Sequence, residues 1–489
     1  MDKNGVATFS GWNKGQAKHP IYGFGLLQNV EVFENKGLAQ IKNLLYTMSA
    51  PVGAYLPVAK VDDFILFGGN TNGSLFNGST HITDAIDRAW DMVKYKDYIW
   101  VRYGSKLAAY GPLSTAPAWF TAILTSFNAD FYGKIIQGQD GYLYTTSGNE
   151  VVKLDVTSYG IPGVAPTVSI ATTLDLPDGQ FATTIEEHGT KIIVGTQGDE
   201  GYFNTGIQAK AKLFAWNRQA GTLGNPGLAD LPVSFKEDRI NAILSHQNKL
   251  YVSAGVTGNI YVTDATNYQK VATLPYTQNV TVNTSRVTPN SMTISAKGTL
   301  IVGLSSLPIG SEGDARYGIY EIDIDSPGYP VSFRTLASGT TDNSAGFYIG
   351  FIREDFNSMY VGWTVNNVNK IDATLAFVTS AYPATIETDL RKVGTFNNKK
   401  TFGHMEWSLA EPLQEGGKIE IYYRTSATGT YVLINSYGYS STATKEVGGV
   451  VSYEDIFPSV ELEYVQLKAV LTNEGGGFNN ISLVSISVW

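Results

Sequence analysis

The sequence contains no cysteine, which excludes disulfide bonds, thiolate metal sites and a cysteine nucleophile. Charged side chains are scarce, at 16% of 489 residues, and acidic residues outnumber basic ones, so the net charge is −9. An acidic chain repels a polyphosphate backbone, and we expect no nucleic-acid partner. No apolar run is long enough to cross a bilayer, and the first residues lack the apolar segment of a signal peptide. We therefore expect neither signal-directed export nor a membrane span.

Glycine, tyrosine and apolar residues are what the sequence has in abundance. It contains 51 glycines and 29 tyrosines, and 43% of its residues are hydrophobic. This composition is that of a soluble globular chain, long enough for more than one core. Tyrosine with valine and threonine favours strands, and glycine favours tight turns. We expect an all-β protein.

A turn followed by an apolar strand recurs along the first three quarters of the chain. From Ile65 to Met359 the aligned positions are about 49 residues apart on average. The seven matching stretches are "DDFILFGG" (62–69), "KDYIWVRYG" (96–104), "DGYLYTTSG" (140–148), "GTKIIVGTQG" (189–198), "NKLYVSAG" (248–255), "GTLIVGLSS" (298–306) and "NSMYVGWT" (357–364). Five of them precede a second strand, in "NEVVKLDV" (149–156), "AKLFAWNR" (211–218), "GNIYVTD" (258–264), "YGIYEIDID" (317–325) and "NVNKIDAT" (367–374).

A repeat of this length, built from short strands, is typical of a β-propeller blade, in which four strands radiate from a central channel. One small sheet cannot bury both faces, so each blade covers its neighbours and the ring has no open end. We expect a seven-bladed propeller, with each repeat forming the two middle strands of a blade. Six or eight blades remain alternatives, and a linear β-solenoid fits less well because its rungs are shorter and more uniform.

The N-terminal stretch "VEVFENKGLAQIKNLLYT" (30–47) has two apolar runs around the turn "ENKG", which predicts a hairpin. We expect it to complete the last or first blade, with a free arm that binds a neighbour as the alternative. Residues 1–29 form an N-terminal arm in this interpretation, and residues 30–385 form the propeller.

The pattern changes near residue 385. In "KIEIYYRT" and "SLVSISVW" apolar and polar residues alternate, as in strands with one buried face. We expect residues 386–489 to form a separate β-sandwich of jelly-roll or related type, after a linker, "SAYPATIETDL" (380–390), that contains Pro383. The one helical pattern lies in "ITDAIDRAWDMVKY" (82–95), where an outer strand with an insertion is the alternative.

Both ends of the chain carry a family resemblance. "EWSLAEPLQEGGKIEIYYRTS", "YVQLKAVLT" and the final "ISLVSISVW" resemble small sandwich domains that end many tailed-bacteriophage tail and virion proteins. "YGFGLLQNVEVFENKGLAQIKNLL" is similar to the starts of phage propeller proteins in which an early strand precedes the first blade. The resemblance implies a virion structural protein of a tail tip, nozzle, collar or fibre, made in the host cytoplasm, that contacts other virion subunits or the host surface.

Residues able to carry chemistry do not form a recognisable motif. No histidine pair has metalloprotease spacing, and no G-x-S-x-G turn or phosphate-binding loop opens a helix. The adjacent carboxylates at 62–63, 186–187 and 199–200 would point to opposite faces of a strand, so we interpret them as turn or solvent residues. The turns at 137–144 and 473–480 could hold Ca²⁺, or could be turns selected for positive φ. The histidines are His19, His81, His188, His246 and His404; we interpret His188 and His246 as surface turn residues. We predict no catalytic residue, no metal site and no cofactor.

Long connections are expected at 157–180, 196–211 and 303–317. "QGDEGYFNTG" (197–206) combines acidic, aromatic and amide side chains, the groups that contact a sugar or a protein partner. We predict a glycan or partner contact at Tyr202, Phe203 and Asn204.

Three functions remain open at this point. The favoured hypothesis is a non-enzymatic virion structural protein that acts as a rigid protein–protein interaction platform, with other virion proteins as partners in a symmetric oligomeric assembly. The first alternative is a carbohydrate-binding adhesin or receptor-binding protein that recognises a host-surface glycan. The second is a propeller glycoside hydrolase or lyase. Fold alone cannot choose among them.

Overall fold

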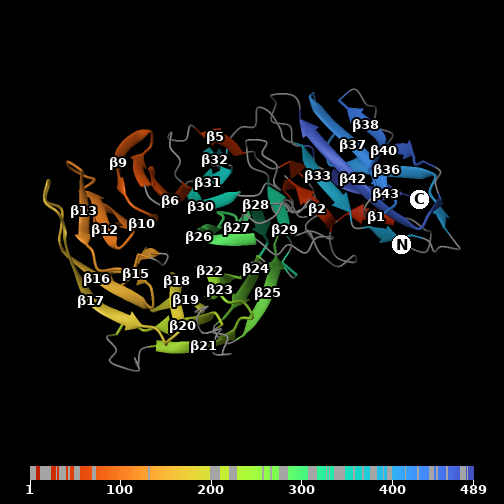
Figure 1. Ribbon diagram of the computed structural model, residues 1–489. Coiled ribbons are helices and arrows are strands. Elements are labelled where there is room, and N and C mark those ends of the chain that lie inside the picture. Colours follow the sequence, from red (N-terminus) through yellow and green to blue (C-terminus); the bar gives the residue numbers. More distant parts are fainter. Residues whose placement is uncertain are drawn as a thin grey trace.

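The structure is a computed structural model, and Figure 1 shows its strands. It describes residues 7–10, 24–28, 30–31, 40–41, 45–48, 56–68, 73–129, 133–198, 210–219, 228–255, 258–264, 267–274, 285–306, 317–326, 328–329, 331–334, 347–355, 358–365, 368–374, 383–388, 390–393, 399–413, 415–426, 429–439, 445–447, 450–458, 461–473, 481 and 483–488. The fold is all-β over these residues. Among them, no helix is long and apolar enough to cross a membrane.

Seven four-stranded antiparallel units, numbered here sheets 1 to 7, follow one another along the chain. Within sheets 1 to 6 the strands pair in chain order. Sheets 1 to 3 are β6 (Leu56–Val61), β7 (Phe64–Gly68), β8 (Gly73–Asn77), β9 (Thr80–Ile86); β10 (Ala89–Tyr95), β11 (Tyr98–Tyr103), β12 (Lys106–Gly111), β13 (Ala118–Leu124); and β14 (Ile135–Gln137), β15 (Leu143–Ser147), β16 (Glu150–Ser158), β17 (Thr167–Asp175).

Sheets 4 to 6 repeat this arrangement, and sheet 7 takes its fourth strand from the N-terminal part of the chain. Sheets 4 to 6 are β18 (Gln180–His188), β19 (Lys191–Gly198), β20 (Lys212–Trp216), β21 (Leu228–Ser234); β22 (Ile240–His246), β23 (Lys249–Ala254), β24 (Asn259–Thr263), β25 (Tyr268–Thr273); and β26 (Ser285–Ile294), β27 (Leu300–Ser306), β28 (Gly318–Ile322), β29 (Val331–Arg334). Sheet 7 is β30 (Tyr348–Asp355), β31 (Ser358–Val365), β32 (Val368–Thr374) and β5 (Leu45–Met48).

The first strands of the seven sheets form a closed ring. Each of β6, β10, β14, β18, β22, β26 and β30 contacts the first strand of the next sheet, and β30 contacts β6. The sheets radiate outward from this inner ring, as Figure 1 shows. All seven repeated stretches found in the sequence are the second strands of these sheets, and the five following stretches are third strands. The predicted middle-strand positions are confirmed.

Apolar side chains fill the spaces between neighbouring sheets, not the inside of any single sheet. One cluster lies between sheets 2 and 3 and contains Trp100 and Leu154, both fully buried. A smaller cluster joins sheet 7 to sheet 1 through Phe351, Phe67 and Ile371. At roughly 25 cal/mol per Å² of apolar surface removed from water, this inter-sheet burial is the main stabilising term of the ring.

Two glycines permit the close approach of adjacent sheets. A Cβ on Gly195 of β19 would lie 2.7 Å from the Ile240 side chain of the next sheet, and one on Gly303 of β27 would lie 2.8 Å from Ile349. Both glycines lie on second strands and meet an isoleucine on the first strand of the following sheet. Small residues are therefore required where the sheets converge toward the ring centre.

Strands from the first 48 residues pair both with the ring and with the C-terminal sheets. Strand β5 pairs antiparallel with β32, with Met48 opposite Ile371, so only the end of the segment expected to complete a blade adds the outer strand of sheet 7; its hairpin forms a separate two-stranded sheet. Strands β3 (Val30–Glu31) and β4 (Gln40–Ile41) form the expected hairpin. Strand β1 (Ala7–Ser10) pairs with the C-terminal β43, and β2 (Phe24–Gln28) pairs with β33.

Two further sheets lie beside the ring and enclose one core (Figure 1). Trp407 and Tyr453 stack in this core, with ring centroids 4.1 Å apart. One sheet has the order β1, β43 (Leu483–Val488), β36 (His404–Leu409), β40 (Val450–Ile456), β39 (Lys445–Val447). The other contains β38 (Val432–Gly438), β37 (Gly417–Arg424), β42 (Tyr464–Asn473), β33 (Ala384–Thr388) and β2, with β34 (Arg391–Lys392) on β42; β35 (Lys400–Thr401) pairs with β41 (Glu461–Leu462).

Two local predictions are corrected by the structure. Of the two interpretations of residues 82–95, the helix is wrong and the outer strand is confirmed for β9, while the rest forms β10; the antiparallel partners of both strands satisfy the backbone groups that a helix would satisfy internally. The predicted linker 380–390 contains strand β33, which lies between β2 and β42. Pro383 immediately precedes this strand, where its missing N–H costs no ladder hydrogen bond.

Candidate functional site

A polar bridge crosses the centre of the ring and joins sheets 1, 2, 3 and 6. We call Asp91, Lys134 and Asn290 the axial bridge. The Lys134 ammonium lies 3.2 Å from the Asp91 carboxylate and donates to the Asn290 side-chain oxygen. The Asn290 amide in turn donates to Asp91 at 2.7 Å and to the Val58 carbonyl at 3.1 Å. The side chains of Asp91 and Lys134 are only 3% and 14% exposed. Water therefore solvates their charges poorly, and each charge is compensated mainly by the other.

Asn290 reaches the axis because strand β26 is irregular at this point. Its register with β27 shifts between Val287 and Met292, and the Ser291 hydroxyl accepts a hydrogen bond from the Thr288 N–H at 2.8 Å. A β-bulge of this kind re-aims a side chain and bends the strand. The bulge thus places an amide between sheets that lie on different sides of the ring.

Glu186 of β18 lies near the axial bridge and has an unusual protonation equilibrium. Burial raises the pKa of its carboxyl to about 7, and the nearby Lys134 ammonium and a hydrogen bond from the Ser245 N–H partly oppose this rise. That hydrogen bond is long, at 3.4 Å. Glu186 is therefore poised to change charge near neutral pH.

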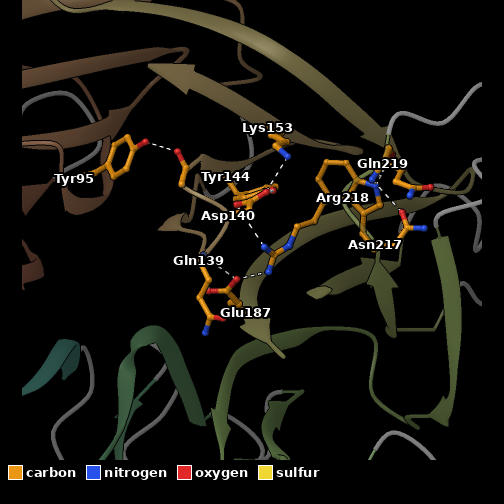
Figure 2. Close-up of polar contacts among 11 residues, drawn as sticks. Tyr95, Gln139, Asp140, Tyr144, Lys153, Glu187, Asn217, Arg218 and Gln219 are labelled. Atoms are coloured by element: carbon orange, nitrogen blue, oxygen red, sulfur yellow. Dashed lines mark hydrogen bonds and ion pairs between the residues drawn. The ribbon is translucent and has the colours of Figure 1, made fainter. Parts of the chain in front are cut away.

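A second polar cluster, the Arg218 cluster, joins sheets 3 and 4 (Figure 2). The Arg218 guanidinium pairs with the Glu187 carboxylate and lies 3.4 Å from Asp140. Asp140 also accepts hydrogen bonds from Tyr144 at 2.5 Å and Lys153 at 2.9 Å. Two carboxylates are thus balanced by two cations. This arrangement leaves no excess charge to attract a ligand, and it ties two sheets together.

The Asp140 turn was predicted either to hold Ca²⁺ or to be a turn that needs positive φ. Gly141 has φ of +79°, which supports the turn interpretation. The pKa of the Asp140 carboxyl is lowered overall. Burial, the largest single effect, raises this pKa, but the hydrogen bonds from Tyr144 and Lys153 and the charges of Lys153 and Arg218 together outweigh burial. Lys153 and Arg218 occupy the place that a bound cation would take. The second predicted turn, 473–480, lies outside the described residues apart from Asn473.

The Glu186–Glu187 pair corrects another prediction. These residues are half-buried strand residues of β18, not solvent or turn residues. Their predicted opposite orientation is confirmed, because Glu187 accepts hydrogen bonds from the Gln139 N–H of sheet 3, while Glu186 accepts from Ser245 of sheet 5. The inter-sheet spaces on both faces of β18 receive a carboxylate. Asp62 pairs with Lys94 at 2.5 Å in an exposed position, and residues 199–200 lie outside the described residues.

The histidines of the described residues lie in four different sheets. His188 and His246 were interpreted as surface turn residues, which is wrong: each is the half-buried last residue of the first strand of a sheet, just before the turn. His188 Nδ1 lies 2.9 Å from the Ser245 hydroxyl, and burial lowers the pKa of His188. Across the part of the chain that the structure describes, no group of three or more His, Asp or Glu side chains could hold a metal ion.

The predicted contact residues Tyr202, Phe203 and Asn204 lie outside the described residues. The strands on either side of this loop are anchored: the Gly198 N–H donates to the Asp238 carbonyl at 2.9 Å, and the Ala211 N–H donates to Glu237 at 3.1 Å. The Glu237 carboxylate accepts hydrogen bonds from Asn259 and Tyr261. The described residues that flank positions 199–209 therefore lie beside Glu237 and its partners Asn259 and Tyr261 of sheet 5.

Sequence reasoning missed the axial bridge and the Arg218 cluster. Lys134, Asn290 and Arg218 belong to no motif, and their partners are 31 to 232 residues away in the chain. One signal was available for Arg218, because "WNRQ" ends a predicted strand at a turn, and Arg218 has a positive φ of 68°. A non-glycine residue in this conformation is uncommon and is often held by its side-chain contacts.

No protein-family model matches the chain, and no curated protein is similar to it. Among solved structures, the chain is similar to the extracellular domain of BT4673 from B. thetaiotaomicron, with a TM-score of 0.44 and 12% identity over 80% of this chain. The match covers 45% of that domain, so the chain spans less than half of its length.

Two smaller solved structures are also similar. The WD40 domain of Pan2 from Neurospora crassa matches with a TM-score of 0.42 and 9% identity, over 69% of this chain and 90% of that domain. The N-terminal domain of Nup159 matches with a TM-score of 0.39 and 12% identity, over 72% and 98%. The description of the fold rests on the strand order and ring contacts of this chain itself.

Proposed function

We infer that sheets 1 to 7 are the blades of a seven-bladed β-propeller and that the two C-terminal sheets form a β-sandwich. The contact of β30 with β6 and the apolar cluster shared by sheets 7 and 1 support ring closure. The shared core around Trp407 supports the sandwich, because side chains from β36, β37 and β42 enter it from two sheets.

We propose that this protein is a non-enzymatic virion structural protein of a tailed phage, acting as a rigid protein–protein interaction platform. The observation that carries the proposal is the continuous hydrogen-bonded path through β38, β37, β42, β33, β2, β29 and the rest of sheets 6 and 7 to β5. Strand β2 links the two parts, since it pairs with β33 and, at Gln28, with Phe333 of β29. The link consists of this one residue pair with β29 and four residue pairs with β33, and it ties the two parts together, which suits a structural component.

The polar groups of the ring support a structural role over a catalytic one. Asp91, Asp140 and Glu187 each engage a buried or half-buried cation of the same chain. Breaking such pairs to serve a substrate would leave an uncompensated buried charge. The ring therefore uses its carboxylates for cohesion, and we propose that other virion proteins, in a symmetric oligomeric assembly, are the partners.

Quantitative mass spectrometry on purified particles tests this proposal. We expect the polypeptide at a fixed copy number relative to the capsid protein, at the same ratio after a second density-gradient step. A ratio that falls with each purification step, or absence from intact particles, would refute a structural role. The glycan-binding and hydrolase alternatives would then be tested by polysaccharide binding and by product release.

A further inference from the structure

The outward face of the C-terminal sheet carries a row of charged and aromatic side chains. Along β37 the residues alternate between buried and half-buried, and Ile419, Ile421 and Tyr423 face the core. The alternate residues Glu420, Tyr422 and Arg424 therefore share the opposite face. Lys468 of β42 lies directly opposite Tyr422 in register, and Glu387 of β33 lies opposite Lys468. Three adjacent strands thus contribute to one surface (Figure 1).

Two cations on this face converge on one aromatic ring. The Arg424 guanidinium lies 4.5 Å from the centroid of the Tyr431 ring, and the Lys468 ammonium lies 4.9 Å from the same centroid. Lys468 also lies 5.0 Å from the Tyr422 ring. Cation–π contacts hold the two positive groups at the surface without neutralising them.

Buried groups position Arg424 in this arrangement. Its Nε donates to the Gln466 side-chain oxygen at 2.8 Å, and Gln466 is only 1% exposed. The Gln466 amide donates in turn to the Thr388 carbonyl at 2.6 Å. Since Nε is used in this bond, the terminal N–H groups of the guanidinium are the ones left to bind a planar anion in the two-pronged geometry that arginine favours.

Neither cation forms an ion pair with a carboxylate of the described residues, whereas neighbouring lysines do. Lys418, on the same face of β37, pairs with Glu420 at 2.9 Å, and Lys392 pairs with Glu463 at 3.5 Å. In a chain with a net charge of −9, these two cations outnumber the one carboxylate beside them, Glu387, which lies opposite Lys468, and the remaining positive charge favours an anion from outside. Burial and the nearby Glu387 raise the pKa of Tyr431, which therefore stays neutral and adds no negative charge.

We propose that Arg424, Lys468, Tyr422 and Tyr431 form a binding site for an acidic sugar residue, of the uronic or sialic acid type. The sugar carboxylate would bind between Arg424 and Lys468, and Glu387 on the same face would accept hydrogen bonds from sugar hydroxyls. A purely acidic peptide fits less well, because it offers no row of hydroxyl groups to donate hydrogen bonds to Glu387. This site is separate from the predicted loop contact at 202–204 and goes beyond the structural role proposed above.

The test uses the full chain and two acidic polysaccharides, polygalacturonic acid and polysialic acid, with neutral dextran and poly-glutamate for comparison. Binding is measured by isothermal titration calorimetry at low and high salt. We expect saturable binding of at least one acidic polysaccharide that weakens with salt, and no binding of dextran. Absence of binding to both acidic polysaccharides would overturn the proposal, and so would equally tight binding of poly-glutamate.

Variants locate the site and control for charge. Arg424→Gln and Lys468→Gln should each weaken binding by about tenfold or more, because each removes a charge-assisted contact. Arg424→Lys should restore only part of the loss, since lysine lacks the fork. Lys418→Gln removes the same charge from the same face but affects a cation already paired with Glu420, so binding should change less than about twofold. Equal effects of Lys418→Gln and Arg424→Gln would show non-specific attraction and overturn the proposal.

The binding result and the virion result are independent. A protein present at fixed copy number in particles but unable to bind either polysaccharide retains the structural role and loses this site. Thermal unfolding of each variant shows whether a loss of binding comes with a loss of folding. If Arg424→Gln does not fold, the milder Arg424→Lys variant tests the role of Arg424 instead. Unchanged binding by a folded Arg424→Lys at every salt concentration would contradict the two-pronged contact of the guanidinium.

Discussion

Lys134 is the residue on which the axial bridge depends, because its ammonium joins the Asp91 carboxylate to the Asn290 amide. Replacing it with methionine keeps most of the side-chain volume but leaves the carboxylate of Asp91, 3% exposed, without its cation. We expect Lys134→Met to lower the free energy of unfolding by about 3 to 5 kcal/mol. Urea denaturation followed by tryptophan fluorescence measures this change.

Lys94→Met is the matched control for that variant. The Lys94–Asp62 pair is shorter, at 2.5 Å, but its side chains are 48% and 51% exposed. Water screens such a pair, so its loss should cost less than about 1 kcal/mol. If both variants lose the same stability, burial of the axial bridge is not what makes it important.

Glu186 predicts a pH dependence of stability. The pKa of its carboxyl in the folded protein is raised to about 7 by burial, whereas an unfolded chain has a glutamate pKa of about 4.3. Between these values the folded state binds more protons than the unfolded state, so this group makes stability fall as pH rises from about 4.3 to about 7. Above that range its contribution no longer changes.

The variant Glu186→Gln isolates this contribution. Burial lowers the pKa of His188, so this neighbour makes stability rise as pH increases from the lowered folded pKa to the unfolded pKa of about 6.5, which opposes Glu186. The difference in unfolding midpoint between wild type and Glu186→Gln, measured from pH 4 to 8, cancels the His188 term. As pH rises from 4 to 7, the unfolding midpoint of wild type should fall relative to that of Glu186→Gln. A difference between the two midpoints that stays constant would contradict a raised pKa of Glu186.

At the scale of elements, strand β5 supplies the fourth strand of sheet 7 from a point more than 300 residues earlier in the chain than β32. The chain has no native cysteine, so an introduced pair can report on this contact alone. Tyr46 and Ala373 are Cα partners in the ladder, at the distance that a disulfide can span. Tyr46→Cys with Ala373→Cys should form an intramolecular disulfide on oxidation, seen as faster migration on a non-reducing gel.

The control for this pairing moves one cysteine to another sheet. Ala272 lies on β25, the outer strand of sheet 5, and does not pair with β5. Tyr46→Cys with Ala272→Cys should remain reduced or form only dimers. A disulfide in both variants would indicate an unpaired, freely moving N-terminal segment, and would contradict the observed closure.

For the whole molecule, the path through β2 predicts that the ring and the C-terminal sheets unfold together. Wild-type protein should show one calorimetric transition. Leu27→Pro, in the part of β2 that pairs with Ile386 of β33, removes a backbone donor and disturbs the ladder, so it should separate the melting into two transitions. Ser169→Pro in the outer strand β17, which pairs only with β16, should lower the melting temperature and keep one transition.

Much of the fold was predictable because the repeated pattern is local. The alternation of turn, apolar strand and second strand in stretches such as 248–264 depends on strand propensity and on glycine turns, which neighbouring residues determine. The N-terminal hairpin and the alternating strands of 416–424 and 481–489 could be read for the same reason. Residues 82–95 stayed ambiguous between helix and strand because seven-residue strands separated by a tight turn can imitate a period of 3.6.

The polar clusters were not predictable, for a reason that particular residues illustrate. Glu187 looked like a solvent residue beside a turn, yet its partner Arg218 is 31 residues away. Asn290 belongs to no motif, yet it meets Asp91, 199 residues earlier. Arg424 and Lys468 are 44 positions apart in the sequence, and only the pairing of β37 with β42 brings both to Tyr431.

By itself, the sequence determined the all-β character, the positions of the middle strands and the absence of cysteine chemistry, because composition and short-range alternation carry that information. The tertiary structure alone decided which charges meet, which strand closes sheet 7 and how β2 links the two parts. These features depend on pairings between distant segments, whose register is set by the burial of whole sheet faces and not by any local preference. The same physical reason places the proposed acidic-sugar site on a face that no single stretch of sequence contains.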